Sequence, residues 1–85
     1  MREELENRLV KFVISIYKLC EGLTESYPAI FLSNELMHAA SVAALHCGEA
    51  GYAKCPEVFE EKIGVITSKL REIQVKLQIL FIARN

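Results

Sequence analysis

The chain carries no large excess of charge of one sign and no long apolar run. Its 85 residues include 10 Lys and Arg against 11 Asp and Glu, a balance that implies neither a polyanionic partner nor an acidic tail. The most apolar tract, VKLQILFIA, is interrupted by Lys76 and Gln78 and is far shorter than the roughly 20 residues that cross a bilayer. The charged N-terminus, MREELENRLVKF, lacks the apolar core of a signal peptide. We therefore expect a cytoplasmic protein that does not span a membrane.

Cysteine and histidine are also scarce, and their spacing argues against a metal site. The three cysteines are an odd number, and a reducing compartment would keep them as thiols. The segment HAASVAALHCGEAGYAKC contains both histidines and two of the cysteines, which are all potential zinc ligands. On a helix, His38 and His46 lie about 80° out of phase, and a helix break separates Cys47 from Cys55. The sequence therefore predicts no metal and no other cofactor.

The same segment lacks what nucleophilic catalysis needs, a thiolate beside an oriented base. His46 and Cys47 are adjacent, but consecutive helical residues do not face each other. Cys55 precedes Pro56 at the expected start of a helix, where the dipole lowers the pKa of a thiol, so we expect it to be the most reactive cysteine. Glu49 is a single carboxylate, which either bonds to a neighbouring helix or is solvated. We predict that the protein is not an enzyme.

The apolar residues recur in steps of three and four, a pattern that predicts helices and no strands. We expect three helices, at about 3–22, 28–50 and 56–83, in a single domain that covers the whole chain. Gly22 and Pro28 mark the first loop, and alanines on the second helix allow a neighbouring helix to approach closely. With two short loops, the pattern predicts an all-α, up-down antiparallel helical bundle.

The third expected helix has the most regular pattern and a large surplus of apolar surface. Its coiled-coil-like seam consists of Phe59, Ile63, Ile66, Leu70, Ile73, Leu77 and Leu80. Val75, Ile79, Phe81 and Ile82 make its last two turns apolar on almost every side, which a solvated helix end would not tolerate. Three helices of this width cannot hide so much apolar surface among themselves. We expect either an oligomer or a fourth helix that is missing.

Basic residues form two stripes that indicate an alternative function. These stripes consist of Lys62, Lys69 and Lys76 on the third expected helix and of Arg8, Lys11 and Lys18 on the first. Such stripes could contact the phosphates of RNA or DNA. However, flanking lysines are usual on soluble coiled coils, and a pI near 6.1 is the opposite of a basic footprint. Nucleic-acid binding is therefore the second hypothesis.

Three segments of the chain resemble a single bacterial family. NRLVKFVISIYKLCEGL, LSNELMHAASVAALHCGEAGYAK and FEEKIGVITSKLREIQVKLQIL are similar to the small four-helix-bundle proteins named for the intervening sequences of large-subunit ribosomal RNA. The resemblance covers roughly residues 5–80 and depends most on a Gly-Glu-Ala run and a Leu-Arg-Glu run. The signature positions include Asn34, Gly48, Glu49, Arg71 and Glu72. The chain departs from the family at His38, where arginine is usual, and at His46, where asparagine is common.

The resemblance implies an antiparallel bundle whose members assemble into rings, commonly homopentamers. One branch of the family is similar to accessory proteins of diversity-generating retroelements, which bind a reverse transcriptase and nucleic acid through a basic surface. This chain stops at Asn85, where members of the family usually continue into a fourth helix. The expected function is a non-enzymatic, self-associating helical scaffold. The alternative is a nucleic-acid or ribonucleoprotein accessory factor that binds RNA or DNA through the lysine stripes.

Overall fold

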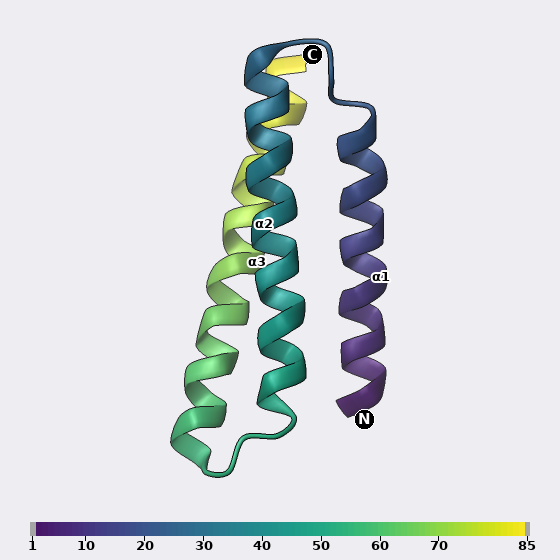
Figure 1. Cartoon of the computed structure of the whole chain (residues 1–85). Helices are drawn as coiled ribbons and strands as arrows, with labels where there is room; N and C mark the ends of the chain where they lie inside the picture. Colours follow the sequence, from purple (N-terminus) through teal and green to yellow (C-terminus); the bar gives the residue numbers. More distant parts are fainter. Residues whose placement is uncertain (1, 85) are drawn as a thin grey trace.

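The computed structural model describes residues 2–84, which form three helices and no strand. Helix α1 spans Arg2–Glu21, α2 spans Tyr27–Ala50 and α3 spans Pro56–Arg84. Figure 1 shows that consecutive helices run in opposite directions, so that the N-terminus lies at the same end as the α2–α3 loop. The all-α fold class is confirmed, and each helix end lies within one residue of its expected position. Within this range, none of the helices combines the length and apolarity that a membrane crossing requires.

Local signals at the helix ends produce two loops of five residues each. At the start of α2, the backbone N–H of Ala29 donates to the Ser26 hydroxyl at 3.2 Å. Pro28 occupies the first turn of α2, where backbone N–H groups have no partner within the helix, so the N–H that proline lacks is not needed. At the start of α3, the N–H of Phe59 donates to the carbonyl of Cys55 at 3.1 Å. Loops this short make consecutive helices antiparallel neighbours.

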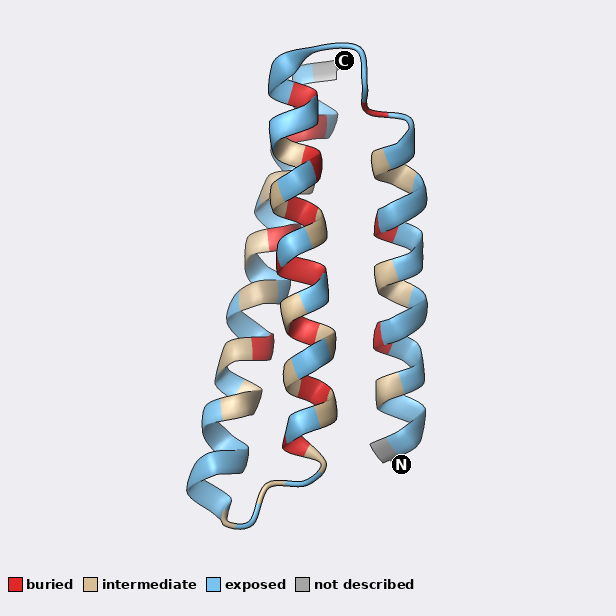
Figure 2. Ribbon diagram, viewed as in Figure 1, coloured by how far each residue is buried: buried red, intermediate tan, exposed pale blue. Residues whose placement is uncertain are grey.

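Helix α2 is the central element, because it packs against both α1 and α3. Among the described residues, no Cα atom of α1 lies within 8 Å of a Cα atom of α3, so the two outer helices do not pack closely on each other. Ala39, Ala40 and Ala43 of α2 are buried, and their small side chains allow both neighbours to approach. Figure 2 shows buried residues along α2 and on the sides of α1 and α3 that face it.

The core follows a seven-residue repeat on the two outer helices. Its members are Leu9 and Ile16 of α1, Leu23 in the loop that follows α1, and Ile66, Ile73 and Leu80 of α3. Leu36, near the middle of α2, is fully buried in the central cluster. The molecule is 45 Å long but only 19 by 17 Å across, so each outer helix has one close neighbour and a wide exposed surface.

The seam that the sequence predicts on α3 is covered on one side only. Ile66 and Ile73 are buried, whereas Phe59 is 47% exposed and Leu70 is 37% exposed. These positions share one broad apolar face, but among residues 2–84 only α2 packs closely against α3. The half of the face that turns away from α2 is therefore left at the surface.

Candidate functional site

Two of the three residues in the lysine stripe of α3 bond to carboxylates of α2. Lys62 Nζ lies 2.9 Å from Glu49 Oε1, and Lys76 Nζ lies 2.9 Å from Glu35 Oε1. Both carboxylates belong to α2, so these pairs join the two helices. The hydrogen bond from Lys62 holds the pKa of Glu49 below its ordinary value. Of the two roles left open for Glu49, the structure shows the bond to a neighbouring helix.

Glu72 lies between two lysines of α3 and completes this network. Its carboxylate oxygens are 2.8 Å from Lys76 Nζ and 3.4 Å from Lys69 Nζ. The hydrogen bond from Lys76 is the main reason that the pKa of Glu72 is lowered. Hydrogen bonds to Glu35 and then to Glu72 raise the pKa of Lys76. The network therefore keeps these groups charged and directs the lysine ammonium groups toward protein carboxylates.

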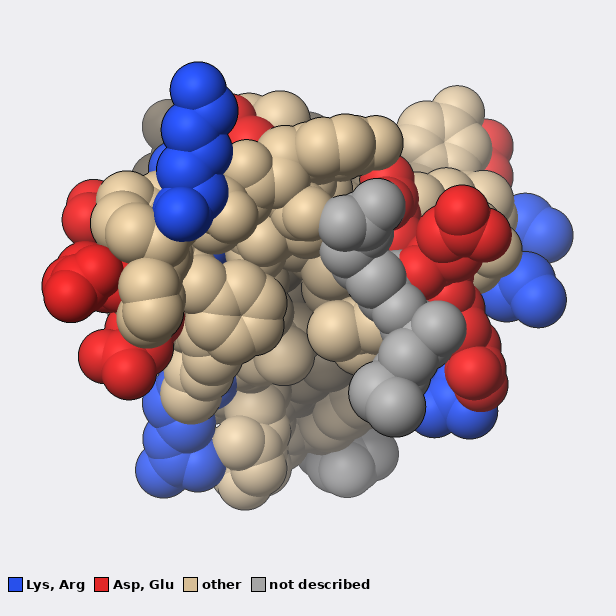
Figure 3. Space-filling view, turned by 90° about the horizontal axis from the view of Figure 1, so that it is seen from below, with Lys and Arg blue, Asp and Glu red and all other residues tan. Residues whose placement is uncertain are grey.

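The basic stripe of α1 lies on a different surface. Lys11 and Lys18 each follow a core residue by two positions, about 200° around the helix, so they point away from α2 and are exposed. Arg8 is exposed as well and pairs with Glu4 of the same helix at 2.9 Å. Figure 3 shows acidic and basic side chains interspersed around the rim of the N-terminal end of the molecule. The structure does not gather the six predicted basic residues in one patch.

The two histidines lie apart and make different contacts. His38 is exposed on α2, beside a shallow depression that Phe31 and Glu72 also line. His46 is half-buried, and its Nδ1 lies 3.0 Å from the carbonyl oxygen of Val42. Within residues 2–84 there is no group of three His, Cys, Asp or Glu side chains that could hold a metal ion. The geometry thus offers no joint role for the two histidines.

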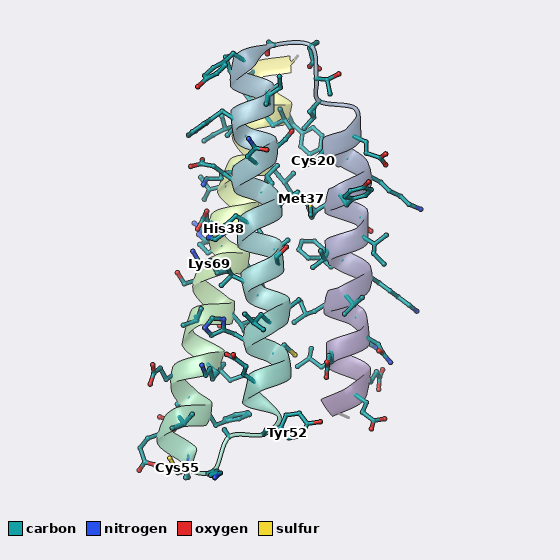
Figure 4. The ribbon with its side chains drawn as sticks, in the orientation of Figure 1. Cys20, Met37, His38, Tyr52, Cys55 and Lys69 are labelled. Atoms are coloured by element: carbon teal, nitrogen blue, oxygen red, sulfur yellow. The ribbon has the colours of Figure 1, made fainter. Side chains whose placement is uncertain are left out.

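The three cysteines are also dispersed. Figure 4 shows Cys20 between α1 and α2, near Met37, and Cys55 at the opposite end of the molecule. Burial raises the pKa of the Cys20 and Cys47 thiols, which makes both poor nucleophiles. Cys55 is half-buried directly before α3, at the helix start expected for it. The structure does not test its reactivity, which stays a prediction.

The signature positions shared with the intervening-sequence family have separate surroundings. Asn34 and Arg71 are exposed, and Arg71 donates a hydrogen bond to Gln74 at 2.9 Å. Gly48 faces α1, where an added Cβ would lie 3.5 Å from a carboxylate oxygen of Glu6. That distance is an ordinary van der Waals contact, so the approach of α1 does not require glycine. The ion pairs of Glu49 and Glu72 give these two positions a structural role.

A groove of about 730 Å³ opens between the N-terminal halves of α1 and α3. The side chains that form it include Leu5 and Arg8 of α1, Cys47 and Ala50 of α2, and Phe59 and Ile63 of α3. Seen from this end, uncharged residues fill the middle of the molecule and charged residues lie around its rim (Figure 3). Phe59 and Ile63 belong to the seam predicted on the third helix and Arg8 to a predicted basic stripe, but the groove itself was not predicted. Spacing along one helix does not report the distance between two helices, and the surplus of apolar surface was the available signal.

The C-terminal turns of α3 form a second uncovered apolar surface. Ile79 is 50% exposed, Phe81 is 55% exposed and Ile82 is 76% exposed. Val75 and Ile79 line a shallow depression on this part of the helix together with Ile82. In the single chain, nothing among the described residues covers these side chains, although exposing them to water is unfavourable.

Comparison of the chain with protein-family models, curated protein sequences and solved structures finds no match. The resemblance to the intervening-sequence family thus stays a prediction from the sequence. The functional interpretation depends on the surfaces of the chain itself, which are an open apolar groove and a set of neutralised lysines.

Proposed function

We propose that the protein is a non-enzymatic, self-associating helical bundle that serves as an interaction scaffold. One observation supports this proposal above all. Large apolar side chains are exposed both along the groove between α1 and α3 and on the last turns of α3. Association of copies removes such surface from water and so provides a favourable free energy.

The arrangement of the chain supports completion of a bundle by association. The three antiparallel helices leave the two outer ones without close contact, and α2 alone joins them. A further helix between α1 and α3 would cover the exposed half of the α3 seam, as in an up-down bundle of four helices. The resemblance to the intervening-sequence family, whose members form rings, agrees with this interpretation and favours five copies.

Sedimentation equilibrium at protein concentrations from 1 to 100 µM tests the proposal. The expected result is a mass that is a multiple of the 9.6 kDa of one chain and that falls on dilution. Five copies would agree with the ring that the resemblance implies, and two with the pairing described below. A single-chain mass over the whole range contradicts the proposal.

Nucleic-acid binding has less structural support, because Lys62 and Lys76 bond to carboxylates of α2. A phosphate backbone would have to compete with these pairs for the same ammonium groups. Titration with RNA and single-stranded DNA at low salt distinguishes the two functions. Binding that weakens steeply with salt and with Lys11→Gln/Lys18→Gln would favour the accessory-factor hypothesis, and no binding would count against it.

A further inference from the structure

The groove between α1 and α3 continues along α3 as a stripe of five apolar residues. Ile63 lines the groove, and Leu70 and Leu77 follow it at intervals of seven residues, which keeps them in nearly the same helical phase. Phe81 follows Ile63 by eighteen residues, which is five turns at about 3.6 residues per turn. With Phe59, these residues form what we call the α3 stripe.

We propose that the α3 stripe binds the same stripe of a second copy of this chain, antiparallel and about a two-fold axis at Leu70. This pairing rests on the proposed self-association and assigns it a two-fold surface, in place of the five-copy ring that the family resemblance favours. Phe59 lies eleven residues before Leu70 and Phe81 lies eleven residues after it. Ile63 and Leu77 are each seven residues from Leu70. An antiparallel pair therefore places Phe59 against Phe81, Ile63 against Leu77 and Leu70 against itself, which is the self-complementarity that a two-fold interface requires.

Helix α1 supplies the second wall for the incoming helix. Leu5 lines the groove opposite Phe59, and Phe12 and Leu19 follow Leu5 at intervals of seven residues. Phe12 and Leu19 are only partly buried in the single chain. Because α1 and α3 run in the same direction, a partner helix antiparallel to α3 is antiparallel to α1 as well (Figure 1). The partner's α3 thus continues the alternating order of helices that is usual in up-down bundles.

The exposed apolar side chains supply about half of the surface that a stable pair buries on each copy. Leu5, Phe59, Leu70 and Phe81 are between 37% and 55% exposed. At roughly 200 Å² for a large side chain, these four residues alone leave about 400 Å² of surface per copy. The partly buried members of both walls and their polar flanks bring the interface toward the approximately 800 Å² per partner of a standard protein–protein interface.

The charges beside the α3 stripe also permit the pairing. On the flank away from α2, the residues nearest the centre of the stripe are Thr67 and Gln74, which are both uncharged. In the antiparallel register, Thr67 of one copy lies beside Gln74 of the other. Arg71, which bonds to Gln74, lies about 100° around the helix from Leu70 and so beside the contact rather than in it. On the opposite flank, Lys69 already pairs with Glu72. The centre of the stripe therefore presents apolar and neutral side chains to its counterpart.

A charge swap tests both the surface and its register. Phe59→Lys places an ammonium against the partner's Phe81 and should weaken dimerisation by roughly 100-fold in sedimentation equilibrium. Adding Phe81→Glu gives each introduced lysine a carboxylate on the other copy and should restore most of the lost affinity. The two positions are about 33 Å apart along one helix, so the restored affinity can arise only between copies. Phe59→Lys with Phe81→Lys is the matched control and should stay weak, and circular dichroism should show the same helicity in all variants.

An introduced thiol at the proposed axis gives an independent test, in a chain whose Cys55 is replaced by serine so that it cannot cross-link. Leu70 is partly exposed, so Leu70→Cys should leave the chain folded. Under mild oxidation, it should form a disulfide between the two introduced thiols at protein concentrations where the wild-type chain is a dimer. Gln78→Cys, which lies away from the axis on the exposed side of α3, should form far less of the corresponding disulfide.

The results separate this pairing from self-association in general. If the wild-type chain associates but the charge-swap variant is as weak as the Lys–Lys variant, the copies meet elsewhere and the pairing is wrong. If the oxidised Leu70→Cys chain remains unlinked while the mass is that of a dimer, the axis is misplaced and the pairing fails again. If the wild-type chain is monomeric throughout, both the pairing and the proposed function fall.

Discussion

The two sides of α3 have the same apolar spacing but very different surroundings. Toward α2, Ile73 is 1% exposed and the flanking Lys76 is held by carboxylates of α2 and α3. Toward the groove, Leu70 is 37% exposed, and it lies only three residues from Ile73. The comparison shows that a regular seven-residue pattern identifies an apolar face but not the helix that covers it. The lysines beside the covered part of the face do identify that helix, because Lys62 and Lys76 bond to carboxylates of α2. At the centre of the α3 stripe, the flank toward α2 carries the Lys69–Glu72 pair, whereas Thr67 and Gln74 on the other flank are uncharged.

The largest expected effect separates these two sides directly. Ile73→Ala should lower the free energy of unfolding by about 3 kcal/mol, because it leaves a cavity in the closely packed core. Leu70→Ala should cost less than about 1 kcal/mol at concentrations where the chain is monomeric, since water already reaches this side chain. Urea denaturation followed by circular dichroism measures both values. Equal losses in the free energy of unfolding would show that Leu70 is already covered in the single chain, which contradicts an open groove side.

The helices themselves could be predicted from the sequence because their signals are local. Gly22 in the first loop, Pro28 in the first turn of α2 and the three-and-four spacing each depend on residues within a few positions. The last turns of α3 carry more apolar residues than three helices can cover, so their exposure in the single chain could be predicted as well. These features need no knowledge of how one helix is rotated against another.

The candidate site could be predicted only in part, because it depends on relations between helices. Lys62 was visible as one member of a stripe, but its bond to Glu49 joins residues thirteen positions apart on two helices. That bond depends on the rotation of α3 about its axis, which side-chain packing decides. The groove depends in the same way on the separation of α1 and α3, which no spacing within one helix determines.

Removing an ion pair on the closed side of α3 should have the next largest effect. Lys76→Met keeps the apolar stem but leaves Glu35 and Glu72 without their shared ammonium group. We expect a loss of about 1 kcal/mol, since the Lys76 side chain is only 20% exposed and bonds to two carboxylates. Arg8→Met removes the exposed pair with Glu4 and is the matched control, with an expected loss below about 0.5 kcal/mol. A control loss as large as that of Lys76→Met would contradict the structural role assigned to the network.

A glycine on the outer surface of α3 offers a smaller gain in stability. Gly64 is exposed within the helix, and an added Cβ would meet no atom within 4 Å. Gly64→Ala should therefore raise the free energy of unfolding by about 0.8 kcal/mol through its helix propensity. Because Gly64 lies about 100° from Ile63 around the helix, the substitution should leave self-association unchanged. Thermal unfolding and sedimentation of the same sample measure both properties, and a weakened dimer would place the interface on the wrong side of α3.

The smallest expected effect is the pH dependence of the stability that Glu72 and Lys76 provide on the side of α3 that faces α2. The hydrogen bond from Lys76 lowers the pKa of Glu72, so the carboxylate stabilises the fold above the ordinary glutamate pKa of about 4.3, and this contribution is lost as the pH falls below that value. The pKa of Lys76 is raised, so its contribution is present below about pH 10.4 and is lost as the pH rises above it. Glu72→Gln should therefore reduce the acid-induced loss of stability between pH 5 and 3 by about 0.5 kcal/mol and change little between pH 6 and 9. Glu4→Gln, on the exposed surface of α1, is the control, and an equal effect from it would mean that the network around Glu72 adds no acid sensitivity of its own.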